Sequence, residues 1–211
     1  VPLDLLSCPT RRSSDPTGRS VAFWSESYGG PHVRPLPRAS YALLASPEPD
    51  FAEGSFLSRR GALHIGRAED APLRDAQIAA FADTALFTRV DGAALGAAVP
   101  GLRADWTIGL AEPTTCDIDV AALHGAYLKR LRARGGTLAC SARFENARPL
   151  PGGGWAVRLG GGEEVRTSLL INAAGAWADD VAHMCGVRAL GIVPMLRTVA
   201  QVRVAAPVAD D

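Results

Sequence analysis

The sequence predicts an α/β fold, because segments with helical and strand periodicity alternate along its 211 residues. The clearest helix is expected over 117–134, where apolar side chains share one face and Gly135-Gly136 follow the last turn. A strand follows at 137–141, and a continuous apolar run at 169–172 predicts a strand buried on both faces. A helix between two strands of this kind predicts a parallel crossover.

A β-hairpin is expected to depart from that crossover. Glycine triplets at 152–154 and 160–162 bracket the alternating segment 155–159, and a further strand is expected at 164–167. No helical pattern follows either triplet, so we interpret both as hairpin turns rather than phosphate-binding loops. Short helices are expected after Thr17-Gly18 and at 39–46, 70–83, 91–99 and 177–185, and further strands at 61–65, 106–110 and 191–204.

Composition narrows the classes of partner. Lys plus Arg equals Asp plus Glu, at 22 each, so no basic field favours nucleic acid or an anionic membrane. No apolar run reaches the length of a membrane span, and no secretory leader is visible. The four cysteines are scattered and share no metal-ligand spacing with the histidines. We therefore expect a cytoplasmic protein with reduced cysteines, no metal, no nucleic-acid partner and no integral membrane segment.

Both ends of the sequence suggest a fragment. The segment PTRRSSD at 9–15 looks like one reading frame of a sequencing adapter, so residues 1–15 are expected to be a non-native tail. An ordinary polar N-terminal tail is the alternative. At the other end, residues 205–211 follow a strand-like run with no closing element.

The stretch LLINAAGAW at 169–177 ends an apolar run in very small residues. These residues either let a helix pack closely on a sheet or leave room for a ligand against the backbone. Ligands of open α/β sheets bind beyond the carboxyl ends of strands, where glycine permits a close approach. The local pattern leaves both explanations open.

Three segments together carry a family resemblance. TGRSVAFWSESY at 17–28 is similar to the S-T-G-R-S-A-A segment of the FAD-dependent D-amino-acid oxidase and dehydrogenase superfamily. INAAGAW at 171–177 resembles its second flavin motif, and DIDVAALHGAYLKRLRARGG at 117–136 resembles the helix between them. The resemblance spans 16–204 and is closest to the D-arginine dehydrogenase-like branch. It implies part of a Rossmann-like FAD-binding domain with an inserted antiparallel-sheet substrate domain.

The resemblance divides the chain into segments of those two domains. It implies FAD-domain segments at 16–46 and 116–190, the latter with the hairpin, and substrate-domain segments at 47–115 and 191–211. FAD is the implied cofactor. The implied cofactor-binding residues are Thr17, Gly18, Arg19, Ser20, Val21, Ala22, Ala142, Arg143, Asn172, Ala173, Ala174, Gly175 and Trp177.

Two residues are implied at the substrate. Tyr28 stands where relatives have a lid tyrosine, with packing at a helix end as the alternative. Arg197 stands where relatives bind the substrate carboxylate, with an exposed strand face as the alternative. Phe23 and Ala62 replace a histidine and a glutamate of the D-arginine branch, so a neutral or apolar D-amino acid, or another small amine or hydroxy acid, is expected.

The implied activity is hydride transfer from a small amine carboxylate to the flavin. The family's N-terminal G-x-G-x-x-G strand and its C-terminal half are absent from this sequence, so the fragment itself is expected to be inactive. The alternatives are a 2-hydroxy acid or glycerol-3-phosphate dehydrogenase of the same superfamily, and a non-catalytic α/β remnant.

Overall fold

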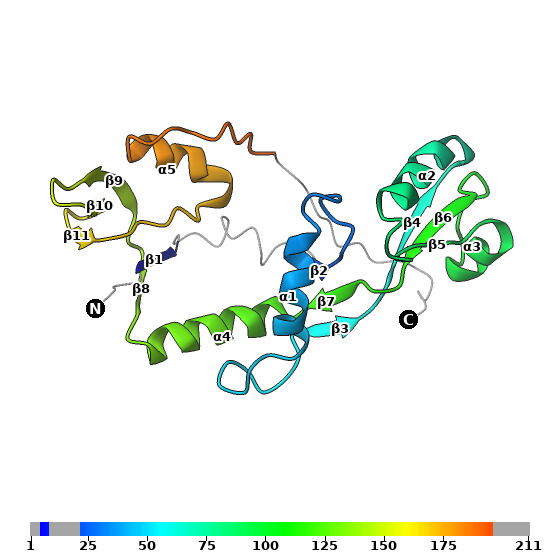
Figure 1. Ribbon diagram of the computed structural model, residues 1–211, viewed down its shortest axis with the longest axis horizontal. Coiled ribbons are helices and arrows are strands. Elements are labelled where there is room, and N and C mark those ends of the chain that lie inside the picture. The colour runs from blue at the N-terminus through cyan, green and yellow to red at the C-terminus, as the bar shows by residue number, and fades with distance from the viewer. Residues whose placement is uncertain (1–4, 9–21, 196–211) are drawn as a thin grey trace. The chain divides into compact units, whose positions relative to one another are not determined.

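The computed structural model describes residues 5–8 and 22–195, which fall into two compact units (Figure 1). We call residues 22–126 the two-sheet unit and residues 5–8 with 127–195 the hairpin unit. Helix α4 (Val120–Ala133) begins in the first and ends in the second. The fold is mixed α/β, which confirms the predicted class.

One sheet of the two-sheet unit is antiparallel with the order β2-β7-β3. Its strands are β2 (Phe23–Trp24), β7 (Cys116–Ile118) and β3 (Leu57–Arg59). Trp24 is buried beside helix α1 (Pro35–Ala45), where its indole Nε1 donates to the Pro37 carbonyl at 2.8 Å. The core of this region consists of Trp24, Leu44, Phe51, Phe56 and Cys116.

The other sheet has the order β4-β6-β5 and is also antiparallel. It contains β4 (Ala62–Gly66), β6 (Ile108–Glu112) and β5 (Thr88–Arg89), with helices α2 (Ala71–Ala80) and α3 (Gly92–Ala98) in contact with β6. Gly109 permits the close approach of α3, because a Cβ there would lie 2.9 Å from the Leu95 side chain and 2.6 Å from the Val90 carbonyl oxygen.

The hairpin unit combines one parallel pair with one antiparallel sheet. Strand β1 (Leu5–Cys8) pairs in parallel with β8 (Thr137–Cys140). Strands β9 (Phe144–Pro149), β10 (Trp155–Leu159) and β11 (Glu164–Thr167) form the antiparallel sheet. Helix α5 (Ala178–Met184) follows, and Cys185 at its end joins a core with Ala147, Val157 and Leu159.

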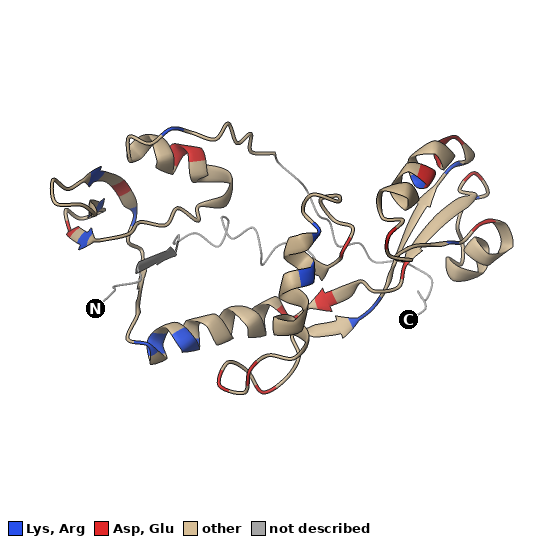
Figure 2. Ribbon diagram, in the orientation of Figure 1, with Lys and Arg blue, Asp and Glu red and all other residues tan. Residues whose placement is uncertain are grey.

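The glycine-based predictions are confirmed. Gly153 and Gly154 have φ of +90° and +82° in one hairpin turn, and Gly161 and Gly162 have +97° and +87° in the next. Helix α4 ends at Ala133, Gly135 has φ of +78° in the turn that follows, and the Gly136 amide donates to the Leu131 carbonyl at 2.9 Å. Lys and Arg gather at this C-terminal end of α4 (Figure 2), where positive charges interact favourably with the negative end of the helix dipole.

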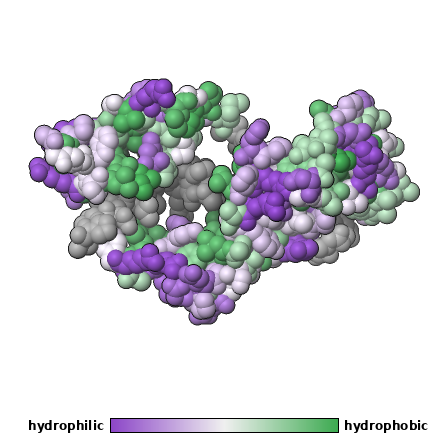
Figure 3. Space-filling model, viewed as in Figure 1, coloured by the Kyte–Doolittle hydropathy of each residue, from purple (hydrophilic) through white to green (hydrophobic). Residues whose placement is uncertain are grey.

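The predicted buried strand at 169–172 is wrong. This segment pairs with no strand among the described residues, and Leu169 and Ile171 are 69% and 77% exposed. Figure 3 shows hydrophobic residues at the surface of the hairpin unit, to which this segment belongs. The Thr167 hydroxyl donates to the Leu169 carbonyl at 2.9 Å, a local bond that competes with a strand ladder.

The strand expected at 191–204 is likewise not formed in its described part, 191–195. Here the amides of Leu190, Gly191 and Ile192 donate to the Asp179 carboxylate instead of to a neighbouring strand. Residues 196–204 lie outside the described part of the chain.

Other elements differ from the sequence-based expectations, among them the first expected helix, α1 and β9. The helix expected after Thr17-Gly18 is absent from residue 22 onward, because the aromatic pair Phe23–Trp24 forms β2 instead. Helix α1 starts at Pro35, four residues earlier than expected, since proline is well accommodated in a first helical turn. Strand β9 was not expected, because its polar sequence FENARP lacks clear alternation.

Gly154 allows a sharp test of the first hairpin turn. We expect Gly154→Ala to lower the free energy of unfolding by about 1–3 kcal/mol, because it forces a side chain into positive φ. A Cβ would also lie 2.5 Å from the Thr167 carbonyl oxygen. Gly152→Ala is the matched control, since Gly152 faces open space in the same turn. Urea denaturation of both variants measures the effect, and equal stabilities would contradict it.

Candidate functional site

The small-residue corner at 172–177 is an exposed turn of the hairpin unit with a fixed backbone. The Asn172 side chain donates from Nδ2 to the Ala178 carbonyl at 2.8 Å and accepts from the Ala174 amide at 3.2 Å. A 3-10 helix, η3 (Gly175–Trp177), then leads into α5. Asn172 therefore holds both ends of the corner through one amide group.

The surface of this corner is open. Gly175 has φ of +58°, and no atom lies within 4 Å of where its Cβ would stand. Ala173, Gly175 and Ala176 are exposed, and Trp177 is 50% exposed. Within the described part of the chain, no atom packs against the Cβ position of Gly175, so close packing does not require a glycine there.

Asp179 fixes the segment that follows α5. Its carboxylate accepts amide hydrogens from Leu190, Gly191 and Ile192 at 2.9, 2.8 and 2.7 Å. These bonds favour the ionised form and lower the pKa of Asp179. Sequence reasoning missed this residue, although an Asp in the first turn of a helix is a common hydrogen-bond acceptor.

Ala142 and Arg143 lie between β8 and β9 of the hairpin unit. Ser141 has φ of +65°, an uncommon value outside glycine, and turns the chain just before them. Ala142 packs against the hairpin core, while Arg143 is exposed and its carbonyl accepts the Gly160 amide at 2.6 Å.

The remaining predicted residues divide between the two-sheet unit and undescribed positions. Ala22 accepts the Ile118 amide at 3.0 Å beside β7, and Tyr28 is 72% exposed in the loop after β2. Thr17, Gly18, Arg19, Ser20, Val21 and Arg197 lie outside the described residues.

A buried carboxylate fixes the loop that contains Tyr28. Glu112, at the end of β6, is fully buried. Its Oε1 accepts from the Ser25 hydroxyl at 2.9 Å and the Glu26 amide at 3.1 Å, and its Oε2 accepts from the Ser27 hydroxyl at 2.6 Å. The Nε2 atom of His64 lies 3.7 Å from Oε2, beyond hydrogen-bond distance.

These donors determine the charge state of Glu112. Burial by itself would raise the pKa, but the contacts with His64, with the Ser27 and Ser25 hydroxyls and with the Ser27 amide outweigh it and lower the pKa to about 2. Because the His64 contact is long, we attribute the lowering chiefly to the serines. Sequence reasoning missed Glu112, although a carboxylate inside the apolar strand Ile108–Glu112 is unusual enough to indicate a bonded group.

Arg34 holds the same loop from its other side. Its side chain is 9% exposed and binds Glu26 at 3.3 Å and Asp83 at 2.8 Å. The hydrogen bond and charge of Asp83, with those of Glu26, outweigh burial and raise the pKa of Arg34. The guanidinium also lies 5.5 Å from the centre of the Phe81 ring.

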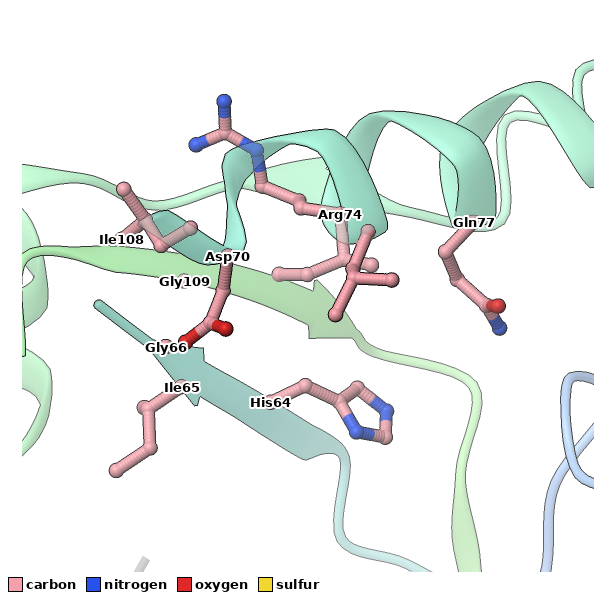
Figure 4. A pocket seen from close by; sticks show the side chains of 10 residues that line it. His64, Ile65, Gly66, Asp70, Arg74, Gln77, Ile108 and Gly109 are labelled. Atoms are coloured by element: carbon pink, nitrogen blue, oxygen red, sulfur yellow. The ribbon is translucent and has the colours of Figure 1, made fainter. Parts of the chain in front are cut away.

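A cavity of about 290 Å³ lies between α2 and the β4-β6-β5 sheet (Figure 4). His64, Asp70, Arg74 and Gln77 contribute polar groups to its wall. Arg74 is bound to Asp91 at 2.9 Å, and Asp70 accepts the Arg67 amide at 2.9 Å. Because structural bonds occupy Asp70 and Arg74, and none of the sequence-predicted site residues lines the cavity, we do not place it in the candidate site.

Neither a metal centre nor a membrane helix is found in the described residues. No group of three His, Cys, Asp or Glu side chains within 5–8 and 22–195 is placed to hold a metal ion. Over the same residues, no helix combines the length and apolarity needed to cross a bilayer. Cys116, Cys140 and Cys185 are free thiols.

The low pKa of Glu112 predicts an acid-sensitive stability. The folded state binds this proton more weakly than the unfolded chain, whose ordinary value is 4.5. The contribution of the carboxylate is complete above that value and is lost as the pH falls towards about 2. The shift corresponds to roughly 3 kcal/mol.

Denaturation of the wild type and Glu112→Gln at about pH 6 and about pH 3 measures this contribution. We expect the stability difference between the two proteins to shrink at the lower pH. A difference that is the same at both pH values would contradict the assignment.

Comparisons with solved structures show the fold. The chain is similar to glycine oxidase from Geobacillus kaustophilus, with a TM-score of 0.70, 15% identity, and coverage of 86% of this chain and 52% of that one. It is similar to FAD-bound L-α-glycerophosphate oxidase from Mycoplasma pneumoniae, with a TM-score of 0.68, 14% identity, and coverage of 82% and 48%. For NikD, an amino acid oxidase of nikkomycin biosynthesis, the values are 0.64, 20%, 78% and 42%.

The chain thus spans about half the length of the solved structures that it matches. The sequence pattern of the DAO family, whose members are FAD-dependent oxidoreductases, matches residues 10–211. The order of the helices and strands and this match over nearly the whole chain lead to one conclusion: the chain belongs to the DAO family of FAD-dependent oxidoreductases.

Proposed function

We propose that this chain forms part of an enzyme that oxidises a small amine carboxylate, such as a D-amino acid. Membership of the FAD-dependent family supports the reaction class. The single observation that supports the site is the exposed corner at 172–177. The Asn172 side chain restrains its backbone through hydrogen bonds to the Ala178 carbonyl and the Ala174 amide.

The corner fits a flavin nucleotide. Its residues are small, Gly175 has open space where a side chain would stand, and the Asn172 bonds restrict the backbone before any ligand binds. We propose that this corner holds FAD together with Ala142, Arg143 and the segment 17–22. When bound, the flavin would accept a hydride from the substrate carbon.

On the substrate side we propose roles for Tyr28 and Arg197. Tyr28 precedes α1 by several residues and is 72% exposed, which supports a lid role over packing at a helix end. Arg197 would bind the substrate carboxylate, for which a planar guanidinium offers paired donors.

The surroundings of Phe23 support a neutral substrate. The Arg60 guanidinium lies 5.0 Å from the centre of the Phe23 ring and is bound to Asp117 at 3.2 Å. Because Asp117 is already bound to Arg60, its carboxylate is not free to pair with a cationic substrate side chain near this face. We therefore propose that the enzyme departs from the D-arginine dehydrogenase-like branch in substrate, prefers neutral or apolar D-amino acids and acts in the cytoplasm.

Other reactions of the superfamily give the alternative to the proposed amino acid substrate. The similarity to L-α-glycerophosphate oxidase favours a 2-hydroxy acid or glycerol-3-phosphate substrate as the second candidate. A non-catalytic α/β domain is the third, and it predicts a protein that does not bind flavin.

Substrate preference can be measured on the complete protein that contains this chain. We expect a flavin absorption spectrum that bleaches without oxygen on addition of D-leucine, and at least tenfold slower bleaching with D-arginine, because the cationic side chain lacks a carboxylate partner. Glycerol-3-phosphate serves as the comparison substrate. Preference for D-arginine would overturn the specificity, and a colourless protein that takes up no FAD would overturn the function.

Substitution of Asn172 tests the proposed binding of FAD at the corner. We expect Asn172→Ala to weaken FAD binding by up to about thirtyfold, because two hydrogen bonds worth about 1 kcal/mol each no longer fix the backbone. Asn146→Ala, on strand β9 of the same unit, is the matched control. Titration of the apoprotein with FAD measures both, and equal affinities would contradict the role of Asn172.

A further inference from the structure

We propose that Glu112 is a positioning residue for Tyr28. Through Ser25, Glu26 and Ser27 it would hold the turn that presents the Tyr28 ring to the substrate. This inference rests on the proposed function for the role of Tyr28, whereas the hydrogen bonds that carry it do not depend on that function.

The donors to Glu112 come from a short segment directly before Tyr28. The Ser25 hydroxyl and the Glu26 amide donate to Oε1 at 2.9 and 3.1 Å, and the Ser27 hydroxyl donates to Oε2 at 2.6 Å. The Ser27 amide is 3.4 Å from Oε1. One carboxylate therefore holds the Glu26 amide and two hydroxyls, and it shares the Ser27 amide with the Ser25 hydroxyl oxygen, which lies 3.2 Å from that amide.

Stability alone does not explain a buried charge at this position. Removing a carboxylate from water is costly, and a well-packed apolar residue is often as stable or more stable in its place. A carboxylate differs from an apolar residue in accepting several hydrogen bonds in fixed directions. The property that Glu112 adds is therefore a defined conformation of the loop 25–27.

The turn that follows transmits this conformation to Tyr28. The Gly30 amide donates to the Ser27 carbonyl at 3.1 Å, and Gly29 has φ of +85° at the turn position where glycine is favoured. Tyr28 stands between the buried Ser27 and these glycines and projects outward with 72% exposure. Its direction is set by the backbone on either side, because the Tyr28 ring is not part of the core.

A second clamp fixes the same loop from the side of α1. Arg34 binds the Glu26 carboxylate at 3.3 Å, and its amide bonds to the Gly30 carbonyl at 3.3 Å. Glu112 and Arg34 thus hold the loop from different elements of the two-sheet unit. Loss of Glu112 leaves the Arg34 clamp in place, so we expect the loop to loosen while the unit stays folded.

Hydrogen exchange of this chain tests the positioning directly. We expect Glu112→Gln and Ser27→Ala each to speed exchange at the amides of Glu26, Ser27 and Gly30 at least tenfold. Exchange within α1 should not change. Ser27→Ala keeps the test valid if the buried Gln variant does not fold, because it removes a single hydroxyl.

Matched controls come from the same unit. Asp91→Asn alters a carboxylate that accepts the Gly109 amide at 3.1 Å and binds Arg74, and Ser40→Ala removes a hydroxyl that bonds to the Pro37 carbonyl at 3.0 Å. Both controls should leave exchange at 26–30 unchanged. Unchanged exchange in Ser27→Ala and in any folded Glu112→Gln protein would overturn the proposal.

Kinetics of the complete FAD-loaded protein test the effect on Tyr28. We expect Glu112→Gln and Tyr28→Phe to raise KM for D-leucine by a similar factor, and the double variant to show no further increase, because both changes act through one side chain. Independent, multiplying effects would overturn the positioning role. Absence of flavin would overturn the proposed function but leave the exchange result intact, so the two failures are distinguishable.

Discussion

The buried carboxylate of Glu112 joins parts of the two-sheet unit that no strand ladder connects. It stands at the end of β6 and accepts hydrogen bonds from the loop after β2, a strand of the other sheet. A buried charge is tolerated only with full hydrogen bonding, so the loop and the strand end require each other. Tyr28 directly follows the bonded residues and is 72% exposed.

In the hairpin unit, too, polar side chains accept hydrogen bonds from backbone amides outside the strands. Asn172 and Asp179 accept backbone amides of segments that belong to no strand among the described residues. Backbone amides need partners wherever they are withdrawn from water, and a short polar side chain supplies them without a neighbouring strand. These two side chains therefore give irregular segments a defined path on both sides of α5.

The proposed function rests on family membership and on the exposed corner at 172–177. A flavin supplies the redox chemistry, so the protein has to hold the cofactor and orient the substrate. We propose that the corner at 172–177, with its small residues and restrained backbone, holds the cofactor. We propose that the exposed Tyr28, on the turn within the loop 25–30, helps to orient the substrate.

The sequence by itself determined the features that depend on neighbouring residues. Glycines with positive φ placed the hairpin turns and the end of α4, and the small residues of 172–177 marked the corner. The tertiary structure alone decided whether apolar runs became strands, because a ladder depends on partners elsewhere in the chain. Residues 169–172 therefore stayed exposed, whereas β1 paired with β8. Glu112 acquired its buried hydrogen bonds only from donors more than eighty positions away in the sequence.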